Sequence, residues 1–209
     1  MSHVALLGDS VFDNRSYTGG EPDVVTHLRA LLPAPWQATL YAVDGTTTID
    51  LGRQLDSLRD HVSHVVLSVG GNDALLNADL LDLPVRSTAQ ALELFQVRLS
   101  DFAANYRNAL EAVSSLGRPT TICTIYNGNL APPEGARARV ALALFNDVIL
   151  RGALELGSNL IDLRLVCTEP SDFANPIEPS GSGGRKIARA IAHALKLGEG
   201  THSIGVTAG

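Results

Sequence analysis

"HVALLGDSVFDN", residues 3–14, is the stretch of the sequence that says most about the fold. It opens with a short run of nearly continuous apolar side chains at residues 3–8, which is typical of a β-strand buried on both faces. The run stops at a glycine that is followed by two polar residues, Asp9 and Ser10. Ligands of open parallel sheets bind beyond the carboxyl ends of the strands. We therefore expect Asp9 and Ser10 at a ligand-binding edge.

Four more short apolar runs follow along the chain, and longer stretches with helical periodicity separate them. This alternation predicts right-handed crossovers and one parallel sheet of five strands with helices on both faces. The fold class is therefore α/β, in three α/β/α layers. The expected strands are residues 3–8, 36–43, 64–70, 120–126 and 159–164, and the expected helices are residues 24–32, 49–58, 88–116, 136–156 and 184–197.

The composition fits one globular domain over residues 1–209. The chain has 209 residues, of which 45% are hydrophobic and 18% charged, with a formal net charge of -6. We find no basic cluster, so nucleic acids and anionic membranes are poor candidates as partners. The glycine-rich end at residues 198–209 is expected to be a loose tail.

The two ends of the sequence and its cysteines carry little further signal. No basic leader precedes the first apolar run, and no stretch reaches the roughly 20 apolar residues of a membrane span. We therefore expect a cytoplasmic protein with no integral membrane segment. Cys123 and Cys167 lack the close spacing of a metal or redox motif, and we expect two reduced thiols.

Three residues at the ends of the first three strands could together stabilise negative charge. Ser10 follows the first strand, Gly45 the second and Asn72 the third. The backbone N–H groups of Ser10 and Gly45 and the side-chain amide of Asn72 could form an oxyanion hole. Taken singly, each has an ordinary alternative role: a helix-capping serine, a turn glycine and a turn-stabilising asparagine.

The order and spacing of these residues resemble the SGNH hydrolases, also called the GDSL family of esterases and lipases. The resemblance rests on "LLGDSVFDN" with Ser10, "VDGTTT" with Gly45 and "SVGGNDAL" with Asn72. It implies a flavodoxin-like sheet, a serine hydrolase that cleaves a carboxylic ester, and Ser10 as the nucleophile. It implies no cofactor and no metal, and its partner would be a small-molecule ester substrate.

The last block of the resemblance departs from the family. The family has a "DxxH" pair before its final helix, but this chain has "NPIE", with Asn175 and Glu178 at those positions. We expect Glu178 to be an unusual general base and Asn175 to orient it by donating its amide hydrogens to the carboxylate. Asp73 is the reserve candidate for the base.

Two alternative functions stay open at this point. A catalytically silent protein could bind an acyl or carbohydrate ligand in the same cleft, which the missing histidine favours. A metal-dependent phosphoesterase could use Asp9, Asp13, Asp73 and Glu178 as oxygen ligands.

The substrate is only weakly constrained by the sequence. The loops after the first two strands are short, which mildly favours a short acyl chain. The leucine-rich segment at residues 77–87 could form an apolar wall of the cleft, or pack beneath the long helix at residues 88–116. The oligomeric state cannot be inferred.

Overall fold

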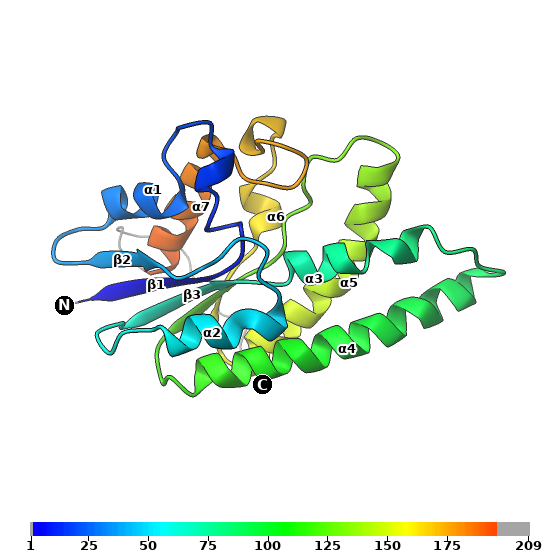
Figure 1. The fold of residues 1–209 in the computed structure, drawn as a ribbon, viewed down its shortest axis with the longest axis horizontal. Helices are drawn as coiled ribbons and strands as arrows, with labels where there is room; N and C mark the ends of the chain where they lie inside the picture. The colour runs from blue at the N-terminus through cyan, green and yellow to red at the C-terminus, as the bar shows by residue number, and fades with distance from the viewer. Residues whose placement is uncertain (1, 196–209) are drawn as a thin grey trace.

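The computed structural model describes residues 2–195, and a five-stranded, all-parallel sheet forms its centre. The strands lie in the order β2-β1-β3-β4-β5, the flavodoxin-like order that was expected (Figure 1). Their bounds are β1 His3–Gly8, β2 Gln37–Leu40, β3 His64–Ser68, β4 Thr120–Cys123 and β5 Asn159–Ile161.

All five predicted strands are present, but four are shorter than their apolar runs. At the end of β4 the reason is visible. The side chain of Asn146 accepts a hydrogen bond from the Ile125 N–H at 2.8 Å and donates one to the Ile125 carbonyl at 2.9 Å. Because a side chain takes the place of a neighbouring strand, the ladder stops and the chain turns into the functional edge of the sheet.

Helices cover both faces of the sheet, as the periodicity predicted. One hydrophobic cluster joins the sheet to α1 and α7, and a second joins it to α2, α4 and α5. The short helices α3 and α6 were not predicted, and α3 contains Asn72, for which a role in a turn was the alternative. The helix bounds are α1 Val24–Leu31, α2 Leu51–Asp56, α3 Gly71–Leu76, α4 Thr88–Ser114, α5 Glu134–Glu155, α6 Leu163–Val166 and α7 Gly181–Ala194.

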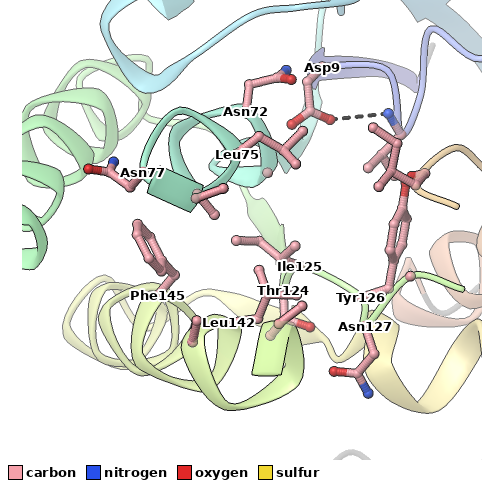
Figure 2. Close-up of a pocket in the computed structure, with 18 of the residues that line it drawn as sticks. Asp9, Asn72, Leu75, Asn77, Thr124, Ile125, Tyr126, Asn127, Leu142 and Phe145 are labelled. Atoms are coloured by element: carbon pink, nitrogen blue, oxygen red, sulfur yellow. Dashed lines mark hydrogen bonds between the residues drawn. The ribbon is translucent and has the colours of Figure 1, made fainter. Parts of the chain in front are cut away.

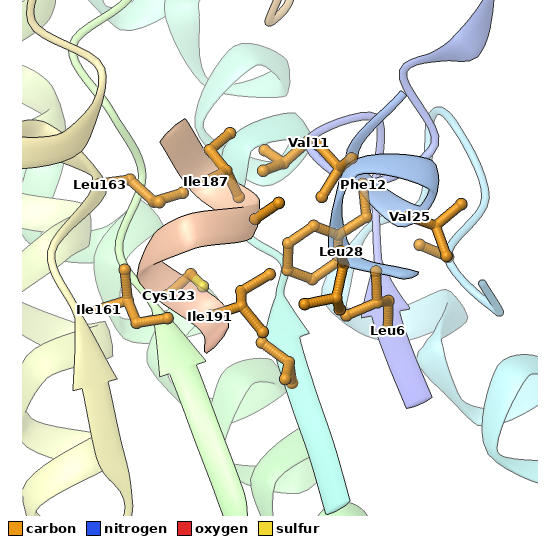
Figure 3. Packing of buried hydrophobic residues seen from close by; sticks show 14 of the residues in the cluster. Leu6, Val11, Phe12, Val25, Leu28, Cys123, Ile161, Leu163, Ile187 and Ile191 are labelled. Atoms are coloured by element: carbon orange, nitrogen blue, oxygen red, sulfur yellow. The ribbon is translucent and has the colours of Figure 1, made fainter. Parts of the chain in front are cut away.

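Strand β1 contributes to both clusters because its side chains alternate between the two faces. Val4 and Leu6 pack toward α1 and α7, whereas Ala5 and Leu7 pack toward α2 and α4. Figure 3 shows Leu6 in the first cluster, between the sheet and the flanking helices. All four side chains are fully buried. This central position fixes the end of β1, where Asp9 and Ser10 lie.

Gly8 allows β1 and β3 to approach closely just before the polar residues. Its φ is 129°, and a Cβ atom there would lie 1.7 Å from the Ser68 carbonyl oxygen. Any other side chain at this position would push the two strands apart. The glycine of the "GDS" motif is therefore required by the backbone geometry of this sheet.

None of the helices within residues 2–195 is long and apolar enough to cross a membrane. The tail predicted at residues 198–209 lies outside the described residues.

Candidate active site

A pocket of about 120 Å³ lies at the carboxyl ends of β1, β3 and β4. Figure 2 shows it between α3, which carries Asn72 and Leu75, and α5, which carries Leu142 and Phe145. Of the predicted site residues, Ser10, Asn72 and Glu178 all line this pocket. The structure thus brings three residues from distant parts of the sequence to one place. Gly45, Asp73 and Asn175 are not among the lining residues.

Ser10 lies in the tight turn that follows β1. The Asp9 carbonyl accepts hydrogen bonds from the N–H groups of Phe12 and Asp13, each at 3.1 Å, and this closes the turn around the serine. Ser10 is 8% exposed and lines the pocket. Its hydroxyl interacts with the Glu178 carboxylate and lowers the pKa of that group. Since a carboxylate can only accept, Ser10 would be the donor of a hydrogen bond between them.

Glu178 is buried at the same wall of the pocket, with 7% of its surface exposed. Burial raises the pKa of Glu178, the hydrogen bond from Ser10 lowers it, and the charge of Asp44 raises it; the net shift is upward. Within the described part of the chain, its Oε2 atom has no hydrogen-bond partner. A carboxylate with a raised pKa is a better proton acceptor than an exposed glutamate.

The backbone of the 174–178 loop is closed on itself around Glu178. The Ala174 N–H donates to the Glu178 carbonyl at 2.9 Å. The Asn175 side-chain oxygen accepts the N–H groups of Ile177 and Glu178, both at 2.9 Å. These bonds make an Asx turn, which fixes the direction in which Glu178 leaves the backbone.

The contact expected of Asn175 therefore differs from the contact in the structure. We expected its amide hydrogens to hold the Glu178 carboxylate, but its side chain is exposed and its oxygen binds the backbone. The physical reason is local, since an asparagine oxygen easily reaches the N–H groups two and three residues ahead. In the structure, Asn175 contacts Glu178 through the main chain instead of through the carboxylate.

Two hydrogen bonds connect the loop after β4 to the 174–178 loop. The Tyr126 hydroxyl donates a hydrogen bond of 2.5 Å to the Ile177 carbonyl. The Asn129 N–H donates one of 2.7 Å to the Pro176 carbonyl. The accepting carbonyls belong to the two residues that precede Glu178 in the chain. Glu178 is therefore positioned by β4 as well as by its own loop.

A buried asparagine, Asn14, binds the residue that follows Glu178. Asn14 is fully buried; its amide donates to the Pro179 carbonyl at 3.1 Å, and its oxygen accepts the Val24 N–H at 3.1 Å. It therefore ties the residue after Glu178 to the first turn of α1. Asn14 was not predicted as a site residue, although it is the last residue of the stretch "HVALLGDSVFDN".

Asn72 lies in the first turn of α3, where its side chain is fixed. Its amide donates a hydrogen bond of 3.0 Å to the Thr46 carbonyl. The amide carries two hydrogens, so the second can be donated into the pocket that Asn72 lines. Gly45 precedes Thr46, is exposed and has a φ of 80°. The structure thus places Gly45 next to the carbonyl that Asn72 binds.

Asp73 holds the neighbouring helices together. Its carboxylate accepts hydrogen bonds from the Thr48 N–H at 3.0 Å and from the Thr48 hydroxyl at 2.6 Å. Burial raises the pKa of Asp73, and these bonds from Thr48 partly oppose the rise. With its oxygens engaged there, Asp73 has no contact with Ser10 that would favour it as the base.

Asp9 is more deeply buried than the sequence indicated. It is 2% exposed, it lines the pocket, and its Oδ1 accepts the Val11 N–H at 3.1 Å (Figure 2). Burial raises the pKa of Asp9 to about 7, a rise that the Val11 N–H opposes and the charges of Glu178 and Asp73 increase. Asp9 therefore carries a proton over much of the acidic range, next to the serine.

The oxygen ligands of the phosphoesterase alternative do not meet around one point. Asp13 accepts the Asp44 N–H at 3.0 Å, and Asp73 is bound to Thr48. Across residues 2–195, no three histidine, cysteine, aspartate or glutamate side chains lie close enough together to hold a metal ion. Cys123 and Cys167 are buried free thiols.

Comparison with known families identifies a match over most of the chain. The model of the GDSL-like lipase/acylhydrolase family matches residues 6–186. The comparison with curated proteins found no match.

Solved structures resemble the chain in fold at low sequence identity. An esterase from Pseudoalteromonas sp., inhibited by monoethylphosphonate, has a TM-score of 0.67 at 17% identity, over 93% of this chain and 97% of that one. A member of the lipolytic G-D-S-L family from Veillonella parvula has a TM-score of 0.71 at 16% identity, over 94% and 99%. A catalytic mutant of an acetylxylan esterase from Geobacillus stearothermophilus has 0.66 at 17%, over 92% and 93%.

Proposed function

Because the chain belongs to the GDSL-like lipase/acylhydrolase family, whose members are ester-bond hydrolases, we propose that it cleaves a small-molecule carboxylic ester with Ser10 as nucleophile and Glu178 as general base. The observation that carries the proposal is the meeting of these two side chains at one wall of the pocket, where Ser10 interacts with the Glu178 carboxylate. A nucleophile within hydrogen-bond reach of a proton acceptor is the geometry that acyl transfer by a serine needs.

The proposed reaction has two steps. The Ser10 oxygen attacks the ester carbonyl while its proton moves to Glu178, and the protonated Glu178 then returns that proton to the departing alkoxide. Water next attacks the acyl-Ser10 ester and loses a proton to Glu178, which returns it to the departing Ser10 oxygen as the acid is released. In both steps the Asn72 amide and the N–H groups of Ser10 and Gly45 would bind the developing oxyanion.

A glutamate can take the place of histidine here because its surroundings compensate for its lower basicity. An unperturbed glutamate has a pKa of about 4.3, against about 6.5 for histidine. Burial raises the pKa of Glu178 and so narrows this difference. In the proposal, Asn175 is a positioning residue that acts through the backbone of Glu178. Asp73, the earlier reserve candidate, has no role as a base, and no other residue takes its place as a reserve.

The acyl group is proposed to be short. The pocket that Ser10 lines is small and mostly apolar, with Leu75, Leu142 and Phe145 among its walls. Leu81, from the leucine-rich segment at residues 77–87, also lines it. A small apolar pocket beside the nucleophile suits the acyl part of an ester better than its polar alcohol.

The alternative is a catalytically inactive protein that binds a ligand in the same pocket without turnover. It is tested as well, because no histidine is among the residues that line the pocket. We would measure hydrolysis of p-nitrophenyl acetate and butyrate by the wild type, Ser10→Ala and Glu178→Gln. Ester hydrolysis that both substitutions abolish supports the proposal. Equal rates for wild type and Ser10→Ala would refute it, and ligand binding without hydrolysis would then favour the silent protein.

A further inference from the structure

One side chain lies between the pocket and a second hollow on the outer surface. Phe95 of α4 lines the pocket that contains Ser10, and it also lines an open groove of about 530 Å³ between α4 and α5. The groove is bordered by apolar side chains such as Leu92, Leu99 and Leu144, and by the polar or charged side chains of Gln96, Ser100, Asp147 and Arg151. Among the described residues, Phe95 is the one that the two linings share.

The size of the pocket sets the length of chain that it can hold. A protein cavity of about 150 Å³ lined by apolar side chains can hold a benzene molecule. The pocket of about 120 Å³ is therefore filled by an acyl tail of about four to six carbons. A longer tail must displace part of the wall.

The walls of the pocket are not equally firm. Phe145 is 2% exposed, and its ring packs on Phe102 with 5.0 Å between centroids, so the pocket cannot lengthen past it. Phe95 is only half-buried, and the open groove lies on its other side. Figure 1 shows α4 running beyond the end of the sheet, so this part of the helix does not lie on the sheet. The wall formed by Phe95 is the one through which a chain could extend.

We propose that Phe95 is the specificity-determining residue of this enzyme: its ring closes the acyl pocket from the α4–α5 groove and limits the substrate to short acyl chains. This inference rests on the proposed function, because it takes the acyl group of the Ser10 substrate as the occupant of the pocket. Removal of the ring joins the two hollows into one channel with an apolar wall that includes Leu92, Leu99 and Leu144. Each methylene that is buried against this wall strengthens binding roughly fourfold.

The test is a chain-length series of p-nitrophenyl esters from acetate to decanoate, measured as kcat/KM. The wild type is expected to prefer butyrate or hexanoate and to lose at least tenfold by decanoate. Phe95→Ala is expected to gain at least tenfold on octanoate and decanoate while butyrate changes little, since two buried methylenes are worth roughly fifteenfold. Leu92→Ala is the matched control, because Leu92 lies on the same helix, lines only the groove and is 63% exposed. Its profile should match the wild type.

A second variant makes the result independent of a cavity-creating substitution. Phe95→Trp keeps the wall filled and adds bulk, so it should retain acetate hydrolysis and lose hexanoate hydrolysis. Superimposable profiles for wild type, Phe95→Ala and Phe95→Trp would overturn the inference, as would a wild type that hydrolyses decanoate as well as butyrate.

Failure of the proposed function is separable from failure of this inference. Binding of butanoate, octanoate and decanoate to the wild type and to Phe95→Ala, measured by calorimetry, needs no turnover. If hydrolysis is absent but Phe95→Ala gains affinity for the two longer acids, the pocket limit stands and the catalytic proposal falls. If hydrolysis depends on Ser10 but neither profile nor affinity changes with Phe95, the pocket limit falls alone.

Discussion

The Ser10 hydroxyl and the Glu178 carboxylate, which come from opposite ends of the chain, meet and interact at the wall of one pocket. The first residue lies just after the interior strand β1 and the second just before α7, and these two elements pack in the same hydrophobic cluster. The core thus holds the two side chains together before any substrate arrives. This preorganisation is what the proposed reaction requires of a site without histidine.

Substitution of Asn72 tests the proposed oxyanion hole. Asn72→Ala removes the amide that would stabilise the transition state, so kcat should fall by about a hundredfold to a thousandfold with a smaller change in KM. Asn77→Ala is the control, because Asn77 lines the same pocket but donates its amide to the Asp73 carbonyl. An equal loss of kcat in both variants would contradict a specific role for Asn72.

Two substitutions of Asn175 separate its possible modes of action. Asn175→Asp keeps an oxygen that can accept the Ile177 and Glu178 N–H groups, whereas Asn175→Ala keeps none. If Asn175 acts through the backbone, Asp should retain most of kcat/KM, and Ala should lose more. If Asn175 acted by donating to the carboxylate, the Asp variant would lose at least as much as the Ala variant.

The hydroxyl of Tyr126 is expected to contribute to the position of Glu178. Tyr126→Phe removes the hydrogen bond to the Ile177 carbonyl, which should lower the free energy of unfolding by about 1 kcal/mol and reduce kcat several-fold. Tyr41→Phe is the matched control, since the Tyr41 hydroxyl is buried without a hydrogen-bond partner within residues 2–195. Its stability and kcat should equal those of the wild type or exceed them. If Tyr126→Phe behaved identically, the bond would have no positioning role.

The buried carboxyl of Asp9 should make stability fall as the pH rises. The folded state raises the pKa of Asp9 from 3.8 to about 7, so between these values it binds more protons than the unfolded state. Stability is therefore lost as the pH rises through this range. Asp9→Asn removes this dependence and can still accept the Val11 N–H. The Tm of the variant relative to wild type should be higher at about pH 8 than at about pH 4.

Asp162→Asn should change the pH dependence of stability in the direction opposite to that of Asp9→Asn. Burial raises the pKa of Asp162, but hydrogen bonds from Arg164 and Thr124 outweigh burial and leave it lowered. Its contribution is present above its unfolded pKa and is lost as the pH falls through the lower folded value. The variant should therefore be most destabilised near neutral pH, and the difference should shrink in acid. Identical pH trends for the two variants would contradict the assignment for Asp9.

The sequence predicted the parts of the molecule that regular patterns encode. The five apolar runs, the periodic stripes and the residues after the strands led to the sheet, its covering helices and the meeting of Ser10, Asn72 and Glu178. The short helix α3 was not predicted because its six residues, which begin with Gly71 directly after Gly70, are too few to show a helical period. Asn175 was misread because hydrogen bonds between a side chain and the backbone depend on loop geometry, which has no sequence period.

The environment of Asp9 and the role of Phe95 could not be inferred for a different reason. A pKa shift depends on burial from every side, and the pocket wall depends on how α4 and α5 pack beyond the sheet. Both are consequences of tertiary packing between residues far apart in the chain. The three-dimensional arrangement was needed to see them.

The pairing of Ser10 with Glu178 is tested most directly by covalent labelling with a fluorophosphonate, followed by intact-mass analysis. We would compare the labelling rates of the wild type, Ser10→Ala and Glu178→Gln. The account predicts one adduct on the wild type, none on Ser10→Ala, and a rate at least about a hundredfold lower for Glu178→Gln, which keeps the shape but cannot accept the proton. Equal labelling rates for the wild type and Glu178→Gln would contradict the claim that Glu178 is the base.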